Sequence, residues 1–149
     1  MATIRLPTDF KEFFELLNSR KVDYLLVGGY AVIYYGYPRA TGGIDLWVRV
    51  SPQNAEAICR ALTAFGFSTT SIETQMFLER HKVFQIGIPP LRIDLLTSVS
   101  GVEFDACFPH SSVIDCDGTP IRIISLADLR ENKTASGRAK DQADLEYLP

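Results

Sequence analysis

Two aspartates, Asp45 and Asp94, stand in short stretches that alternate apolar and polar residues. In the stretch Ile44–Val50 the apolar residues at even positions share one face of a predicted strand, so Asp45 lies on the other face. In the predicted strand Leu91–Leu96, Asp94 shares a face with Arg92. Carboxylates from neighbouring strands can hold one or two divalent metal ions. These two aspartates are therefore candidate metal ligands, and a solvated strand face is the alternative interpretation.

The pair Gly28-Gly29 directly follows the apolar run Tyr24–Val27. This order predicts a buried strand that ends in a tight glycine turn. Glycine lets the backbone approach a ligand closely, and the N–H groups of such a turn and of the following helix start can cradle phosphate oxygens. Gly28 and Gly29 are therefore candidates for binding phosphates, although a plain turn has the same signature.

The elements that must position these residues follow from hydrophobic periodicity and from capping residues. The predicted helices span residues 9–19 (capped by Asp9), 30–35, 52–65 (capped by Ser51 and stopped at Gly66), 126–135 (capped by Ser125) and a segment from about Asp141 after a break at Gly137. The predicted strands span residues 24–27, 44–50, 83–88, 91–96 and 121–124, with 83–88 and 91–96 as a hairpin. We expect one α/β or α+β domain over residues 1–149, with a mixed sheet flanked by helices.

Residues 28–48 (GGYAVIYYGYPRATGGIDLWV) and 91–96 (LRIDLL) resemble the nucleotidyltransferase-fold superfamily, in particular its small bacterial branch with abortive-infection and antitoxin-type members. The family pattern is a strand, a Gly-Gly or Gly-Ser turn, a short helix, Asp-x-Asp on the next strand and a third carboxylate on a later strand. Residues 125–148 resemble the tail of these proteins. The resemblance implies a nucleotidyltransferase-like mixed sheet, with Asp45 and Asp94 as catalytic, metal-binding residues.

Gly43 is where the sequence departs from this pattern, because it stands where the family has the first aspartate of Asp-x-Asp. The resemblance implies that this carboxylate would help to ligate both metal ions. Losing a principal metal ligand could cost several orders of magnitude in rate. Three explanations stay open: a naturally inactive member, a rearranged metal site, and an inactivating substitution.

Basic residues near the C-terminus could complete the site by neutralising phosphates. They are Lys133, Arg138 and Lys140, and the resemblance favours Lys133 for nucleotide binding. Because acidic residues are interspersed with them, an ion-paired helix surface is the competing interpretation. Arg39 and Thr41, in the loop before the Asp45 strand, are weaker candidates for contacting nucleotide or acceptor.

Composition is that of an ordinary globular protein, with 46% hydrophobic and 22% charged residues. The net charge of -3 argues against a general polyanion binder but not against a local phosphate site. The three cysteines contain no CxxC pair, and the chain shows no signal-peptide core or membrane-length apolar stretch. We therefore expect a cytoplasmic protein that does not enter a membrane.

The leading hypothesis is a magnesium-dependent (or manganese-dependent) protein that binds a nucleoside triphosphate and transfers nucleoside monophosphate to a protein or RNA hydroxyl. In it Asp45 and Asp94 hold metal, Gly28 and Gly29 contact phosphates, and Lys133 adds positive charge. The alternative is a non-catalytic binding protein, such as one component of a toxin–antitoxin pair. A homodimer or a partner protein could help to hold the acceptor. A dinucleotide-binding or P-loop enzyme is disfavoured, since neither glycine motif occurs.

Overall fold

Six strands form one mixed sheet in the computed structural model, which describes residues 4–67 and 73–149. They are β1 (Tyr24–Val27), β2 (Gly43–Val48), β3 (Val83–Ile86), β4 (Arg92–Leu96), β5 (Ser112–Cys116) and β6 (Thr119–Ile123). Their order across the sheet is β3-β4-β2-β1-β6-β5. The pairs β2·β4 and β1·β6 are parallel, and the other neighbouring pairs are antiparallel. The predicted mixed sheet is confirmed.

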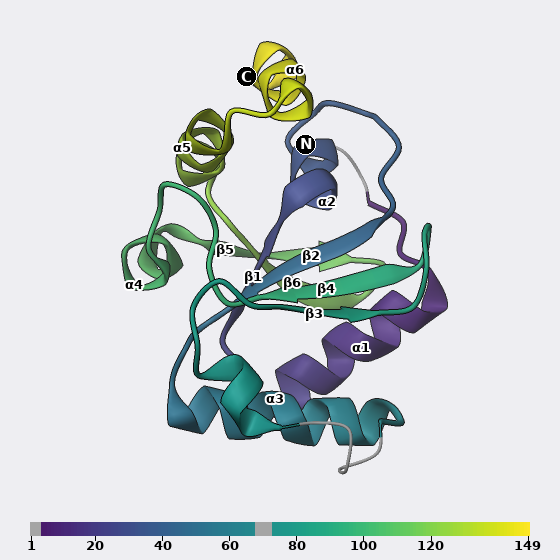
Figure 1. The fold of residues 1–149 in the computed structure, drawn as a ribbon. Helices are drawn as coiled ribbons and strands as arrows, with labels where there is room; N and C mark the ends of the chain where they lie inside the picture. The colour runs from purple at the N-terminus through teal and green to yellow at the C-terminus, as the bar shows by residue number, and fades with distance from the viewer. Residues whose placement is uncertain (1–3, 68–72) are drawn as a thin grey trace.

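Helices cover both faces of this sheet (Figure 1). Below it in the view lie α1 (Thr8–Ser19) and α3 (Pro52–Phe65), and above it lie α2 (Gly28–Tyr34), α5 (Leu126–Ser136) and α6 (Ala139–Tyr147). The connections include the short helix α4 (Phe104–Cys107) and the 3₁₀ turns η1 (Thr74–Phe77) and η2 (Phe108–His110). Within the described ranges, no helix is both long and apolar enough to cross a membrane.

Capping side chains fix the ends of the helices, mostly as predicted. The Ser51 side chain accepts a hydrogen bond from the Asn54 N–H, and α3 ends at a glycine with positive φ. Ser125 caps α5 in the same way, through the Asp128 N–H. The prediction that Asp9 caps the first helix was wrong. Pro7 precedes the helix and makes no side-chain cap, and Asp9 instead lies in the first turn, where its charge favours the helix dipole.

The core lies between the sheet and the lower helices. The α1 residues Phe10, Phe13, Phe14 and Leu17 are fully buried, and Ile44, Leu46 and Val48 of β2 are buried as well. The predicted alternation of β2 therefore holds for its apolar face. The opposite face is also covered near the end of the strand, because the Trp47 ring packs edge-on against Phe104 at a centroid distance of 5.2 Å.

Several element boundaries differ from the prediction. The strand β5 was not expected, because its exposed, unpatterned sequence SVIDC carries little strand signal. The strand β2 ends two residues early, since Val50 leads into the Ser51 cap. Helix α2 begins at Gly28 rather than near Tyr30, so the glycine pair forms its first turn.

Candidate nucleotide and metal site

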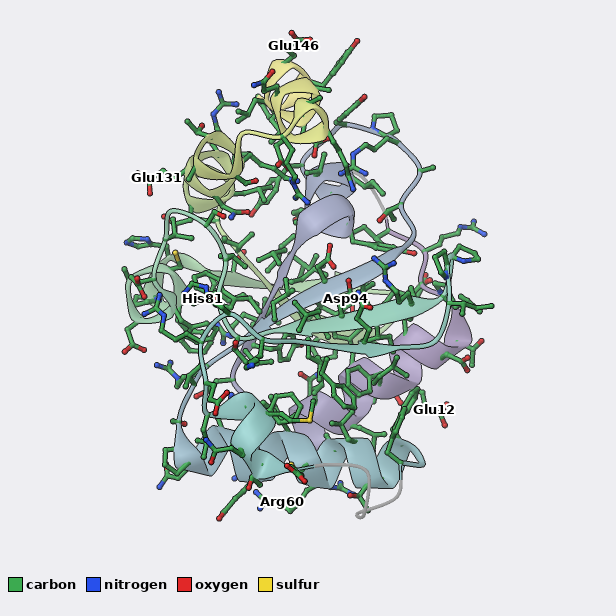
Figure 2. All side chains as sticks on the ribbon, viewed as in Figure 1. Glu12, Arg60, His81, Asp94, Glu131 and Glu146 are labelled. Carbon is green, nitrogen blue, oxygen red and sulfur yellow. The ribbon has the colours of Figure 1, made fainter. Side chains whose placement is uncertain are left out.

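Asp45 and Asp94 lie side by side on neighbouring parallel strands. β2 and β4 pair so that Asp45 stands opposite Asp94, and Gly43 stands opposite Arg92 two residues earlier. Adjacent strands are about 4.8 Å apart, so side chains at matching positions on one face are close. The two carboxyl groups are near enough for the charge of Asp94 to act on Asp45. Asp94 is marked near the middle of the sheet in Figure 2.

Gly28 packs directly against the Asp45 carboxyl group. Its φ of +66° lies in the left-handed region, and a Cβ at this position would come within 2.1 Å of Asp45 Oδ2. At Gly29 a Cβ would come within 2.6 Å of Thr41 Oγ1. The backbone conformation at Gly28 and its contact with Asp45 therefore favour glycine, whereas a side chain at Gly29 would first displace that of Thr41. The N–H groups of the first helical turn have no partner within α2, so they are available to an anion.

The pKa of Asp45 is raised to about 6. Burial is the largest cause, followed by the charge of Asp94 and the hydrogen bond with it, while Lys140 and Arg92 act in the opposite direction. The ionised carboxylate of Asp45 is therefore costly in this fold. A bound cation would relieve that cost.

Arg92 holds both carboxylate oxygens of Asp94. Its Nε donates to Oδ1 at 3.0 Å, and its Nη2 donates to Oδ2 at 3.2 Å. The Asp94 side chain is 9% exposed, whereas that of Arg92 is 37% exposed. This two-point geometry is the strong form of an ion pair, so Asp94 already has a cation at its side.

Gly43 occupies a position where the two strands leave no room for a side chain. A Cβ there would lie 1.9 Å from the Arg92 carbonyl oxygen and 2.7 Å from its carbonyl carbon. Both atoms belong to the backbone, so β4 would have to move to admit an aspartate. The geometry disfavours simple loss of an aspartate from an otherwise unchanged strand. A rearranged site or a naturally inactive protein fits it better.

A cavity of about 360 Å³ opens beside Asp45. The glycine turn and Asp45 form part of its lining, and α5 and α6 contribute the rest together with the loop after β4. The polar lining residues from those segments are Ser100, Asn132, Lys133, Ser136, Arg138 and Lys140. The fold therefore brings the predicted glycine turn, one predicted aspartate and all three predicted basic residues to one cavity.

Lys133 has two buried acidic partners. Its Nζ lies 3.0 Å from Asp141 Oδ1 and 3.0 Å from Asp144 Oδ2, and its side chain is 5% exposed. Asp144 also accepts two hydrogen bonds from Arg39, and Asp141 accepts further bonds from Arg138. These residues form an ionic cluster that ties α6 to α5 and to the loop before β2. The predicted role of Lys133 in nucleotide binding stays a prediction, and the ion pairs give it a structural role in any case.

Burial alone would raise the pKa of the carboxyl groups in this ionic cluster. For Asp141, hydrogen bonds from Arg138, Ser136 and Lys133 outweigh burial and hold the pKa below its usual range. For Asp144, hydrogen bonds from Arg39 and Lys133 have the same effect. Both carboxylates are therefore firmly ionised.

Lys140 lines the same cavity and is not part of the ionic cluster. Its pKa is lowered, first by burial and then by the charges of Arg39 and Lys133, whereas Asp45 acts to raise it. A lysine surrounded by other cations gains by binding an anion. Lys140 is therefore a stronger candidate for a phosphate contact than Lys133, which the sequence favoured.

The two weaker candidates from the loop before β2 both have partners within the protein. Arg39 forms an ion pair with Asp144, and the Thr41 hydroxyl donates to the Gly43 carbonyl oxygen.

The donor set fits a single magnesium ion. Magnesium is usually bound through one or two carboxylates, with waters and substrate phosphates completing its shell. Asp45 and Asp94 meet this need, although Asp94 shares its oxygens with Arg92. In the described residues there is no group of three or more acidic, histidine or cysteine side chains placed to hold a metal. The site thus lacks the donors of a three-carboxylate centre.

Two solved structures resemble this fold. One is a provisionally assigned nucleotidyltransferase from Thermotoga maritima, with a TM-score of 0.61 and 16% identity over 92% of this chain and 88% of that one. The other is an antigenic nucleotidyltransferase-like protein from Paracoccidioides brasiliensis, with a TM-score of 0.54 and 15% identity over 96% of this chain and 75% of that one. No protein-family model matches the sequence, and no curated protein matches it. The chain has the nucleotidyltransferase-like fold that its motifs predicted.

Sequence reasoning missed the pairing of Arg92 with Asp94 and the cavity residues Ser100 and Asn132. Arg92 stands two residues before Asp94 on the same predicted face, so the spacing alone could have suggested the ion pair. Ser100 and Asn132 gave no such signal. Asn132 donates to the Ser100 carbonyl oxygen, a contact between residues far apart in the chain that only the fold creates.

Proposed function

We propose that this chain is a nucleotidyltransferase that uses magnesium or manganese and transfers nucleoside monophosphate from a nucleoside triphosphate to a hydroxyl of a protein or RNA. The observation that carries the proposal is the in-register pair Asp45 and Asp94, where Asp45 lines a cavity that has a glycine turn on one side and basic residues on another. The fold of the two similar structures supports the same class of reaction.

The reaction forms a bond between the acceptor oxygen and the α-phosphorus and breaks the bond from that phosphorus to the β-phosphate bridge. Pyrophosphate leaves with the electron pair of the broken bond, and the proton of the acceptor hydroxyl passes to solvent water. Such transfers need positioning and charge neutralisation more than covalent help from the protein. A divalent ion, when bound, would supply part of that neutralisation.

The residues of the cavity suit these tasks. Asp45 would hold the ion, with Asp94 beside it. The N–H groups of the turn at Gly28 and Gly29 would donate to phosphate oxygens, and the side chains of Arg138 and Lys140 would offset phosphate charge. The Ser100 and Asn132 side chains add neutral polar groups to the same wall.

The direct test is transfer of a radioactive α-phosphate from each of the common nucleoside triphosphates to candidate proteins and RNAs, with magnesium or manganese present. We expect labelled acceptor with the unmodified chain and none with Asp45→Asn or Asp94→Asn. The matched control is Asp115→Asn, because Asp115 is exposed on the edge strand β5, which β1 and β6 separate from β2. Equal labelling by all four proteins would contradict the proposal.

A second candidate function is favoured by the closed position at Gly43 and by the ion pair on Asp94. Both features suit a protein that lacks a complete metal centre and acts by binding a partner, for example in a toxin–antitoxin pair. Co-expression with the product of the adjacent gene, followed by size-exclusion chromatography, should then give a stable complex. Robust nucleotide transfer by the unmodified chain would rule this function out.

A further inference from the structure

Four positions form a square on the face of the sheet that carries the candidate site. Gly43 and Asp45 stand on β2, and directly opposite them stand Arg92 and Asp94 on β4. Residues two apart on a strand share a face, so all four positions belong to one surface. The square therefore holds two carboxylates, one guanidinium and one corner without a side chain.

The empty corner cannot be filled without moving the backbone. A Cβ on Gly43 would collide with the carbonyl of Arg92, the residue directly across from it. The guanidinium of Arg92 extends along its own strand to both oxygens of Asp94. The same strand geometry thus excludes a third carboxylate and places a permanent positive charge beside the second one.

This arrangement sets the charge of the square. Two aspartates and one arginine give the square one net negative charge. Arginine stays protonated in proteins, so this positive charge does not depend on pH or on metal concentration. A square with one net negative charge can offset part of one divalent ion and little more.

We propose that Arg92 is a fixed cation that takes the place of a metal ion at Asp94, so that the site binds a single divalent ion, on the Asp45 side. This inference rests on the proposed function, because it describes how that same site meets its metal. Arg92 is a positioning residue in this scheme. It holds the Asp94 carboxylate against its own guanidinium and leaves Asp45, which lines the cavity, to the incoming ion.

An ordinary structural ion pair would behave differently. If Arg92 only held β4 in shape, its removal would weaken the fold and with it any metal binding. If Arg92 stands in for a metal ion, its removal leaves the Asp94 carboxylate without its cation. Divalent ions should then bind more tightly, whereas loss of a purely structural ion pair would make them bind more weakly.

The experiment measures Mn²⁺ binding by electron paramagnetic resonance for the unmodified chain, Arg92→Gln and Arg92→Lys. We expect Arg92→Gln to bind Mn²⁺ about tenfold more tightly or better, because a positive charge next to the ion is gone. Arg92→Lys keeps the charge and should stay close to the unmodified chain. The matched control is Arg80→Gln, whose exposed pair with Glu103 lies outside the square and should change nothing.

A count of bound ions tests the same inference without a variant. Anomalous diffraction from crystals of the unmodified chain with Mn²⁺ and a non-hydrolysable ATP analogue should show one manganese at the square, and two would overturn the inference. Unchanged or weaker binding by folded Arg92→Gln would also overturn it while leaving the proposed function standing. If neither the unmodified chain nor Arg92→Gln bound Mn²⁺, the metal-dependent function and this inference would both fail.

Discussion

The fold treats two close pairs of aspartates in opposite ways, the buried pair Asp141 and Asp144 and the pair formed by half-buried Asp45 and buried Asp94. In the ionic cluster, Asp141 and Asp144 share Lys133 and have an arginine each, and their pKa values lie below the usual range. In the candidate site, burial and the neighbouring aspartate raise the pKa of Asp45 to about 6. The first pair is satisfied within the protein. In the second pair Arg92 is bonded to Asp94, whereas Asp45 has no ion pair within the described residues, as expected of a place that binds a cation.

The comparison gives the two acidic pairs different roles, one in stability and one in binding. The cluster joins α5, α6 and the loop before β2, and its members Lys133 and Arg138 line the cavity. Asp45 of the site pair lines the same cavity, and the charge of Lys140 acts on it. Four substitutions would separate these roles.

The largest expected effect is that of Lys133→Met. Removing the shared ammonium leaves two buried carboxylates without their common partner, and breaking a buried pair in this way costs about 3–5 kcal/mol. The free energy of unfolding, measured by urea denaturation, should fall by that amount. A loss below about 1 kcal/mol would show that the cluster does not stabilise the fold as argued.

Asp45→Asn should raise the free energy of unfolding, whereas Lys133→Met should lower it. Because the folded-state pKa of Asp45 is raised from 3.8 to about 6, the protein loses stability as pH rises through this interval and the carboxyl ionises. The variant escapes that loss, so it should be about 1–3 kcal/mol more stable than the unmodified chain above pH 7. The gain should vanish below pH 4. Denaturation curves between pH 3.5 and pH 8, without metal, measure it.

If Asp45→Asn gains stability but loses nucleotide transfer, Asp45 is a functional residue that lowers the free energy of unfolding. Its control is Asp141→Asn, which should destabilise the protein near neutral pH because the carboxylate there is ionised and paired. If both variants were destabilised equally, the contrast between the two acidic pairs would be wrong.

Gly43→Ala tests whether the backbone of β4 leaves no room for a side chain at position 43. The added methyl group would meet the Arg92 backbone, and overpacking of this kind costs about 1–3 kcal/mol. Thermal denaturation should show the loss. Gly43→Asp carries the same steric cost, so comparing it with Gly43→Ala isolates the effect of the added carboxylate on nucleotide transfer. Normal stability of Gly43→Ala would mean that β2 and β4 can accept a side chain here.

The smallest expected effect on stability is that of Arg138→Gln. Its guanidinium pairs with Asp141, but its side chain is 71% exposed, so the pair should contribute less than about 1 kcal/mol. Because Arg138 lines the cavity, the variant should still bind a nucleoside triphosphate more weakly, and isothermal titration calorimetry can measure this. An unchanged affinity for the nucleoside triphosphate would mean that Arg138 acts only in the ionic cluster and does not contact the nucleotide.

Much of the fold could be predicted because its signals are local. The strand at Tyr24–Val27, the glycine turn, the caps at Ser51 and Ser125 and the face carrying Asp45 each follow from a few consecutive residues. The same kind of evidence showed that Gly43 departs from the family pattern. The strand β5 was not predicted, because its residues lack a clear alternation. Its antiparallel pairing with β6 is what makes this segment a strand.

By itself the sequence determined which residues could do chemistry and on which faces of their strands they lie, because alternation along a strand needs no knowledge of the rest of the chain. Only the tertiary structure decided which of them meet. The parallel register of β2 and β4 joins segments about fifty residues apart, and it places Asp45 beside Asp94 and Gly43 against Arg92. It also brought Lys133 and Lys140 to the same cavity and paired Lys133 with two buried aspartates. Long-range pairing of this kind depends on the packing of the whole sheet, which no local pattern records.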